Sequence, residues 1–215
     1  FAEYNINNKD YLPIPWATII DFDIDMKILS NIEKKEYITC CQHIHFRKII
    51  PYMKILGVKI LYTPHKVKGE NSLNGIEIRP CPLYAVNFED PERNAIFKDK
   101  NFVELERKYL YSFRGGWNRV YMSNIRKEIF NLEKKEDILI ENSGGWHFEK
   151  TVYGGDQKGD GKYEKGNDVE NYNLVLLNSR YSLCPSGTGP NSIRFWESLA
   201  CGSIPVFSKC QPPEF

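Results

Sequence analysis

Arg194 and Glu197 have the residue types and the spacing of a pair that could bind a nucleotide. They are three positions apart, so on a helix both side chains lie on the same face. Arg194 supplies a fixed positive charge for a phosphate, and the Glu197 carboxylate can accept hydrogen bonds from a ribose diol. A plain surface ion pair has the same spacing, so the surrounding residues must decide between the two alternatives.

The surrounding sequence predicts that this pair follows a strand directly. The apolar run at residues 181–184 predicts a strand, and apolar residues at three- and four-residue spacing over 193–200 predict a helix. Gly202 ends that helix, and residues 204–207 predict a second strand. Together these elements predict a parallel βαβ unit with a right-handed crossover.

The loop between the first strand and the helix has the composition of an anion site. Ser186, Gly187 and Gly189 allow a ligand to approach the backbone closely, and Asn191 or Ser192 can cap the helix. The unpaired N–H groups and the positive dipole end of the helix then face the crevice beyond the strand. A diphosphate suits such a site.

The same residues resemble a family signature. Leu183-Cys-Pro-Ser-Gly, Ser192-Ile-Arg and Glu197-Ser-Leu-Ala-Cys-Gly-Ser-Ile-Pro-Val are similar to the signature of exostosin-type glycosyltransferases, family 47. The resemblance extends to Arg107-Lys-Tyr-Leu-Tyr-Ser-Phe-Arg-Gly and Asn124-Ile-Arg, and it covers about the second half of the chain. It implies the GT-B fold, which is an α/β architecture of two Rossmann-like domains with parallel sheets. It also implies transfer with inversion from a nucleoside-diphosphate sugar, expected to be a UDP-sugar, to a hydroxyl of a glycan or glycoprotein acceptor, with no cofactor and no essential metal.

The resemblance assigns the donor to the C-terminal domain. The residues predicted to bind it are Arg114, Gly115, Ser186, Gly187, Thr188, Gly189, Asn191, Ser192, Arg194 and Glu197. Arg194 is also predicted to assist catalysis by offsetting the charge of the leaving diphosphate. The aromatic run at residues 146–153 is a candidate for stacking on the nucleobase. Arg126, on a helix predicted over 121–132, is a secondary candidate with a structural alternative.

The first third of the chain offers candidates for the base that activates the acceptor hydroxyl. Three apolar runs, at residues 17–20, 37–41 and 58–62, predict parallel strands, and each is followed by polar groups. Asp21, His43 and His45 are the candidate bases, and His65 is expected to face the same cleft. Two alternatives stay open: a GT-A-type transferase that binds manganese through Asp21, Asp23 and Asp25, and a non-catalytic exostosin-like binding domain.

The remaining pattern predicts two domains. Helices are expected at residues 26–35, 46–56 and 171–178, strands at 109–113 and 138–140, and loops at 66–76 and 156–168. A linker near residues 88–100 would separate an acceptor-side domain, 1–90, from a nucleotide-sugar-binding domain, 91–215. Because relatives continue further, the chain is expected to be truncated at its C-terminus.

Composition narrows the class of protein. Among 215 residues, a 41% hydrophobic and 13% aromatic content suffices for a core, and the net charge of +1 argues against a nucleic-acid partner. No apolar run is long enough for a membrane span. The six cysteines lack CxxC spacing, which disfavours zinc, and Cys184 and Cys201 are expected to be buried. The absence of glycosylation sequons favours a cytoplasmic location, with the Golgi lumen as the alternative if an anchor has been removed.

Overall fold

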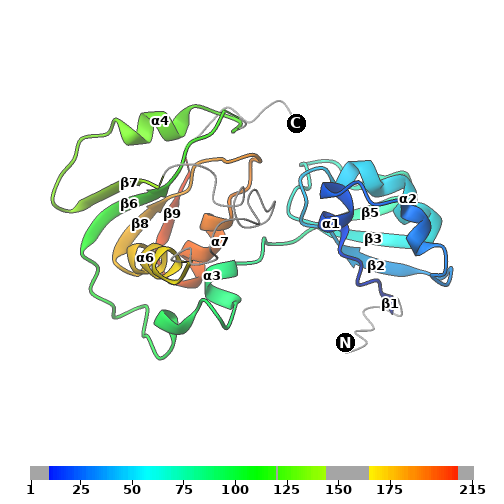
Figure 1. The fold of residues 1–215 in the computed structure, drawn as a ribbon, viewed down its shortest axis with the longest axis horizontal. Helices are drawn as coiled ribbons and strands as arrows, with labels where there is room; N and C mark the ends of the chain where they lie inside the picture. The colour runs from blue at the N-terminus through cyan, green and yellow to red at the C-terminus, as the bar shows by residue number, and fades with distance from the viewer. Residues whose placement is uncertain (1–9, 120, 144–164, 208–215) are drawn as a thin grey trace, which may run out of the picture. The chain divides into compact units, whose positions relative to one another are not determined.

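The chain folds into two α/β units, each with its own sheet (Figure 1). The computed structural model describes residues 10–119, 121–143 and 165–207. The first unit ends at Leu83 and the second begins at Tyr84, ahead of the predicted linker at 88–100. The short helix α3 (Val86–Glu89) packs on helix α7 (Ile193–Ala200) of the second unit, which accounts for the earlier division.

The first unit contains a five-stranded sheet in the order β1-β2-β3-β5-β4. Strands β1 (Asp10–Tyr11), β2 (Tyr37–Cys40), β3 (Val58–Thr63) and β5 (Ile76–Pro80) are parallel, and β4 (Ser72–Leu73) is antiparallel at the edge. Trp16, Phe46, Met53 and Leu61 are almost fully buried in its core. The parallel sheet confirms the predicted fold class.

Helices occupy the connections that join β1, β2 and β3. They are α1 (Trp16–Asp21), the 3-10 helices η1 (Met26–Leu29) and η2 (Phe46–Ile49), and α2 (Ile50–Leu56). The predicted helix over 46–56 is confirmed, and it closes at Gly57 with a φ of 94°. A side chain there would be excluded, since a Cβ would stand 2.1 Å from the Lys35 carbonyl oxygen.

Three expectations for the first unit are wrong. Residues 17–20 belong to helix α1 and not to a strand, because Trp16 and Ile19 bury one helical face in the core. The helix predicted over 26–35 is only the single turn η1. The loop predicted over 66–76 contains β4 and leads into β5, whose alternating buried residues Ile76 and Ile78 form a strand pattern.

The second unit contains four parallel strands in the order β7-β6-β8-β9. These are β6 (Tyr109–Gly115), β7 (Ile138–Asn142), β8 (Ser179–Leu183) and β9 (Ile204–Val206). Helix α4 (Ile125–Phe130) lies on one side of the sheet, and α6 (Lys165–Leu177) and α7 (Ile193–Ala200) lie on the other (Figure 1). A 3-10 turn, η3 (Ala95–Phe97), and α3 complete this unit.

The strand order creates a switch point between β6 and β8. From β6 the chain passes through α4 to β7 on one side, whereas from β8 it passes through α7 to β9 on the other. Connections that diverge in this way leave a crevice beyond the carboxyl ends of the two central strands, where open α/β sheets bind ligands. Among the described residues, none of the helices is long and apolar enough to cross a membrane.

Candidate functional site

The predicted βαβ unit is present around the switch point. Strand β8, helix α7 and strand β9 follow one another, and β8 pairs with β9 in parallel. Gly202 ends the helix with a φ of 73°. Ser192 is the N-cap residue, but its side chain makes no capping hydrogen bond, and the Asn191 Oδ1 accepts one from Trp196 Nε1 at 3.2 Å. The Ser192 side chain therefore does not cap the first turn of the helix.

Arg194 joins the ends of the two central strands. Its guanidinium donates to the carbonyl oxygen of Arg114 at the end of β6 and, at 3.4 Å, to that of Leu183 at the end of β8. The same group lies 4.4 Å from the centre of the Phe113 ring. Arg194 therefore stands in the crevice that the strand order creates.

Arg126 brings a second guanidinium to this crevice from helix α4. It donates to the carbonyl oxygens of Ser186 at 3.1 Å and Gly116 at 2.9 Å, and it stacks on the Tyr121 ring at 4.3 Å. Burial, and then the charge of Arg194, lower the pKa of Arg126 to about 10, so the group remains a cation at neutral pH. The sequence placed Arg126 second because its position in Asn124-Ile-Arg gives no sign of which loop it reaches.

In the described part of the chain the charge of Glu197 acts on Arg194, but the Tyr172 hydroxyl lies between the two groups. Neither Arg126 nor Arg194 forms an ion pair there, and both lie near the ring of Phe113. Two glycines keep the space beside them open. A Cβ on Gly115 would stand 3.1 Å from Arg194 Nη2, and a Cβ on Gly187 would stand 3.4 Å from Arg126 Nη2. A partly buried pair of like charges with open space beside it favours an anionic ligand.

Glu197 is buried and already accepts two hydrogen bonds. Its side chain is only 5% exposed, and its oxygens accept from the Asn87 backbone N–H at 3.1 Å and the Tyr172 hydroxyl at 2.7 Å. Burial raises the pKa of Glu197, and the Tyr172 bond opposes that rise. The Tyr172 hydroxyl also accepts from Arg194 Nε at 3.3 Å. Tyr172 thus links Arg194 to Glu197, and the predicted ribose contact of Glu197 stays a prediction.

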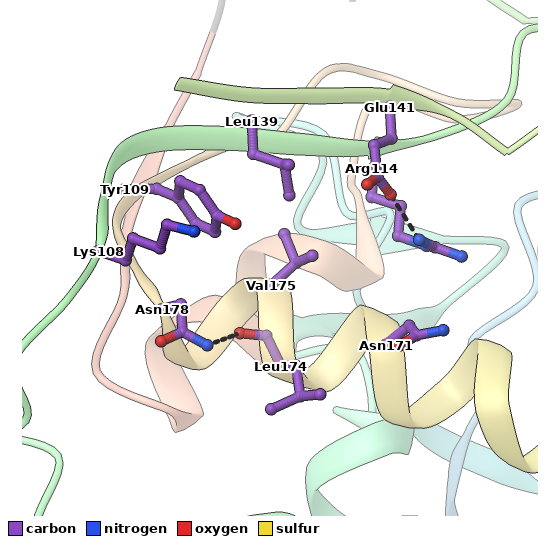
Figure 2. Close-up of a pocket in the computed structure, with 9 residues that line it drawn as sticks. All are labelled: Lys108, Tyr109, Arg114, Leu139, Glu141, Asn171, Leu174, Val175 and Asn178. Atoms are coloured by element: carbon purple, nitrogen blue, oxygen red, sulfur yellow. Dashed lines mark hydrogen bonds and ion pairs between the residues drawn. The ribbon is translucent and has the colours of Figure 1, made fainter. Parts of the chain in front are cut away.

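Arg114 lies apart from the other two arginines. Alternation along β6 sends its side chain to the face opposite Phe113, where Nη1 pairs with Glu141 Oε2 at 2.5 Å. Figure 2 shows this pair at one end of a cavity of about 460 Å³ between β6, β7 and helix α6. The predicted approach of Arg114 to a diphosphate would require it to leave Glu141, because the ion pair now fixes its guanidinium.

Polar groups gather at the carboxyl edge of the first sheet. Asp21 ends α1, and its Oδ1 lies 2.9 Å from the Nε2 of His43, which follows β2. The rings of His43 and His45 are 5.4 Å apart. His65, after β3, contacts the Gln42 carbonyl oxygen through Nε2 at 3.0 Å. The three predicted base candidates are therefore neighbours.

The three aspartates near the end of α1 do not converge. Asp21 contacts His43, whereas Asp25 accepts a hydrogen bond from the Lys27 backbone N–H at 2.9 Å and caps η1. Asp23 stands between them with a φ of 48°. In the part of the chain that the structure describes, no three His, Cys, Asp or Glu side chains are grouped to hold a metal ion.

The remaining predicted residues lie in the loop after β8, in the core, or outside the described residues. Thr188 is exposed and Gly189 is buried in the loop after β8, and the Gly187 N–H donates to the Gly189 carbonyl oxygen at 3.2 Å. Cys184 and Cys201 are buried, as predicted. The aromatic run at 146–153 and most of the loop at 156–168 lie outside the described residues.

The fold and the site define a doubly wound α/β protein with a basic crevice at its strand switch point. Comparison with known proteins then gives the family. The Exostosin GT47 domain matches residues 56–211, so the chain belongs to the exostosin GT47 family. The two Rossmann-like units agree with the GT-B architecture that the signature implies.

Individual relatives are similar over parts of their length. The human protein named ribitol-5-phosphate xylosyltransferase 1 is 31% identical over 211 residues, which is 94% of this chain and 42% of that protein. The Caenorhabditis elegans exostosin-1 homolog is 31% identical over 144 residues, or 64% of this chain and 36% of its own length. The chain thus spans less than half of either relative.

Proposed function

We propose that this protein is a glycosyltransferase that moves a sugar from a nucleoside-diphosphate sugar to a hydroxyl of a glycan acceptor. The observation that carries the proposal is the pair of guanidiniums, Arg126 and Arg194, at the switch point beyond β6 and β8. Membership of the exostosin GT47 family supports the same reaction.

The arrangement suits the charge that develops on the leaving group. As the bond between sugar and diphosphate breaks, negative charge accumulates on the bridging and terminal phosphate oxygens. Arg194 is already held by two strand ends, and Arg126 by two carbonyl oxygens, so neither has to reorganise during the reaction. Preorganised charges of this kind stabilise a transition state more effectively than mobile ones.

The finer features of the reaction are also proposals. The donor is a UDP-sugar, the leaving diphosphate is neutralised by arginine without an essential metal, and the acceptor attacks with inversion. A xylosyl donor is the first to test, because the human relative is named for xylosyl transfer to ribitol 5-phosphate. The base is one of Asp21, His43 and His45 in the first unit.

Calorimetry with UDP and GDP, with and without EDTA, tests the nucleotide site. UDP should bind to the wild type equally well in EDTA. Arg194→Gln should weaken binding about 10- to 100-fold, since charged hydrogen bonds contribute about 1.5–3 kcal/mol each. Arg180→Gln, at an exposed position on β8, is the matched control and should bind normally.

Activity is measured as release of the nucleoside diphosphate, with ribitol 5-phosphate as acceptor: UDP from UDP-xylose, UDP-glucose or UDP-galactose, and GDP from GDP-mannose. Arg194→Gln should reduce turnover by roughly 10²–10³. Because Arg194 also joins β6 to β8, thermal unfolding must show that the variant is folded. A folded Arg194→Gln protein with wild-type nucleotide affinity would remove the basis of the proposal.

A further inference from the structure

A short chain of hydrogen bonds fixes the orientation of the Asp21 carboxylate. The backbone N–H of His45 donates to His43 Nδ1 at 3.0 Å, and His43 Nε2 lies 2.9 Å from Asp21 Oδ1. The side chains of His43 and Asp21 are 17% and 18% exposed, so the pair is sheltered and still reachable. The two residues come from different elements, the loop after β2 and the end of α1.

These two hydrogen bonds determine which nitrogen of His43 holds the proton. A backbone N–H can only donate, so His43 Nδ1 must accept and therefore has no hydrogen. In the neutral ring the hydrogen is then on Nε2, from which it is donated to Asp21 Oδ1. Protonation of Nδ1 would break the bond to the His45 backbone.

His43 consequently has no lone pair to offer a substrate. Nδ1 is used by the His45 N–H, and Nε2 is a donor. Asp21 differs, because among the described residues its second oxygen, Oδ2, accepts no hydrogen bond. A carboxylate with one oxygen held and the other available is the arrangement that general-base catalysis requires.

We propose that Asp21 is the general base of the transfer reaction and that His43, in its Nε2–H form, positions it. This inference rests on the proposed glycosyltransferase function. In the step, Asp21 Oδ2 takes the proton of an acceptor hydroxyl while the hydroxyl oxygen bonds to the anomeric carbon of the sugar. The bond from that carbon to the diphosphate breaks, and its electron pair leaves with the nucleotide.

Orientation, and not charge, separates Asp21 from its competitor His45, because a neutral imidazole can also accept a proton. Desolvation, and then His43 and Lys48, lower the pKa of His45, so it is neutral at neutral pH. Its ring forms no hydrogen bond within the described residues that would aim it at a substrate, and its only ring contact there is tilted against His43. Desolvation also lowers the pKa of the neighbouring His65, with smaller contributions from His43, Arg47 and His45. Orientation therefore favours Asp21.

Nitrogen-15 NMR of histidine-labelled full chain tests the tautomer without any substrate. His43 should show a protonated Nε2 and an unprotonated Nδ1 at pH 7.5, identified by comparison with His43→Gln. A protonated Nδ1, or an even mixture of the two tautomers, would overturn the positioning role.

Kinetics with the best donor of the panel test the base. Asp21→Asn should lower kcat by about 10²–10⁴ and leave UDP affinity unchanged. His43→Ala should lower kcat about 10-fold or more, and His43→Gln should recover part of the loss because its amide can donate to Asp21. Asp10→Asn, which only breaks the exposed Asp10–Lys35 ion pair, is the control and should match the wild type.

The competing assignment has its own signature. If His45→Gln removes turnover while Asp21→Asn retains it, His45 is the base and the inference is wrong. If the wild type binds neither UDP nor GDP and releases no nucleoside diphosphate from any donor, the proposed function fails and the base role fails with it. The NMR result then still decides whether His43 positions Asp21.

Discussion

At the scale of single residues, the crevice contains two guanidinium groups that repel each other. Arg126 and Arg194 both lie against Phe113, and each is bonded to carbonyl oxygens at the sheet edge. Burial, and then repulsion from Arg194, lower the pKa of Arg126. The repulsion lowers the folding stability of the protein without ligand. An anion that contacts both groups offsets the repulsion, and this favours binding.

Gly187→Ala should separate binding from folding. The nearest neighbour of an added Cβ is Arg126 Nη2 at 3.4 Å, an ordinary contact, so the free energy of unfolding should change by less than about 0.5 kcal/mol. The methyl group would occupy space next to the guanidinium, and UDP affinity should fall roughly 10-fold. Urea unfolding and calorimetry measure the two effects.

Gly115→Ala provides the contrasting variant. Its Cβ would stand 3.1 Å from Arg194 Nη2 and 3.2 Å from Phe113 Cζ, so this change should reduce stability as well as affinity. If Gly187→Ala instead binds UDP as tightly as the wild type, the nucleotide does not approach Arg126 from that side.

The sequence predicts most directly the part of the site that one helix contains. Arg194 and Glu197 share the face of α7, so their spacing reveals them. Tyr172 bonds to Arg194 across 22 positions, and the Asn87 N–H reaches Glu197 across 110. Contacts of that range depend on how helices pack on the sheet, which local periodicity does not specify.

At the scale of elements, Arg107 connects the ends of two helices. Its guanidinium donates to three carbonyl oxygens at the end of α6 and the start of β8, and to that of Cys201 after α7. The carbonyl oxygens at a helix C-terminus lack intrahelical partners, and a cation there also suits the helix dipole. Arg107 therefore joins the C-terminal ends of α6 and α7 to the start of β8.

Arg107→Lys should destabilise the second unit although the charge is kept. The single ammonium group of lysine cannot donate to several carbonyl oxygens at once as the planar guanidinium of arginine does. We therefore expect a loss of about 2–3 kcal/mol in the free energy of unfolding. Urea unfolding followed by far-UV circular dichroism measures it, with Lys108→Arg as the neighbouring control. An Arg107→Lys protein as stable as the wild type would show that water replaces these bonds without cost.

Predictability also differed between elements. The βαβ unit around α7 was predicted almost to the residue, because Gly202 and the helical spacing mark its boundaries. The sequence predicts a strand where helix α1 lies, since the short run Ala-Thr-Ile-Ile at residues 17–20 fits either element. Packing decides its conformation: Trp16 Nε1 donates to Thr39 Oγ1 at 2.7 Å, and Thr39 in turn donates to the Leu12 carbonyl oxygen at 2.8 Å.

At the scale of the whole molecule, each unit has a separate apolar core. One core gathers around Trp16, Phe46 and Met53, and another around Phe97 and Leu176. Every residue of the proposed nucleotide site belongs to the second unit. A ligand that binds only the folded form slows global opening by the factor 1 + [L]/Kd, so the protection should follow the unit that binds it.

Hydrogen exchange with and without UDP tests this expectation. At a UDP concentration 100 times Kd, amides of β6 and β8 that exchange through global opening should slow about 100-fold, whereas those of β2 and β3 should change little. Arg194→Gln serves as the control: at the same UDP concentration its 10- to 100-fold weaker binding should slow these amides only about 2- to 11-fold. Equal slowing in β3 and β8 would mean that the two cores open together, and the nucleotide would then stabilise the first unit as strongly as the unit that binds it.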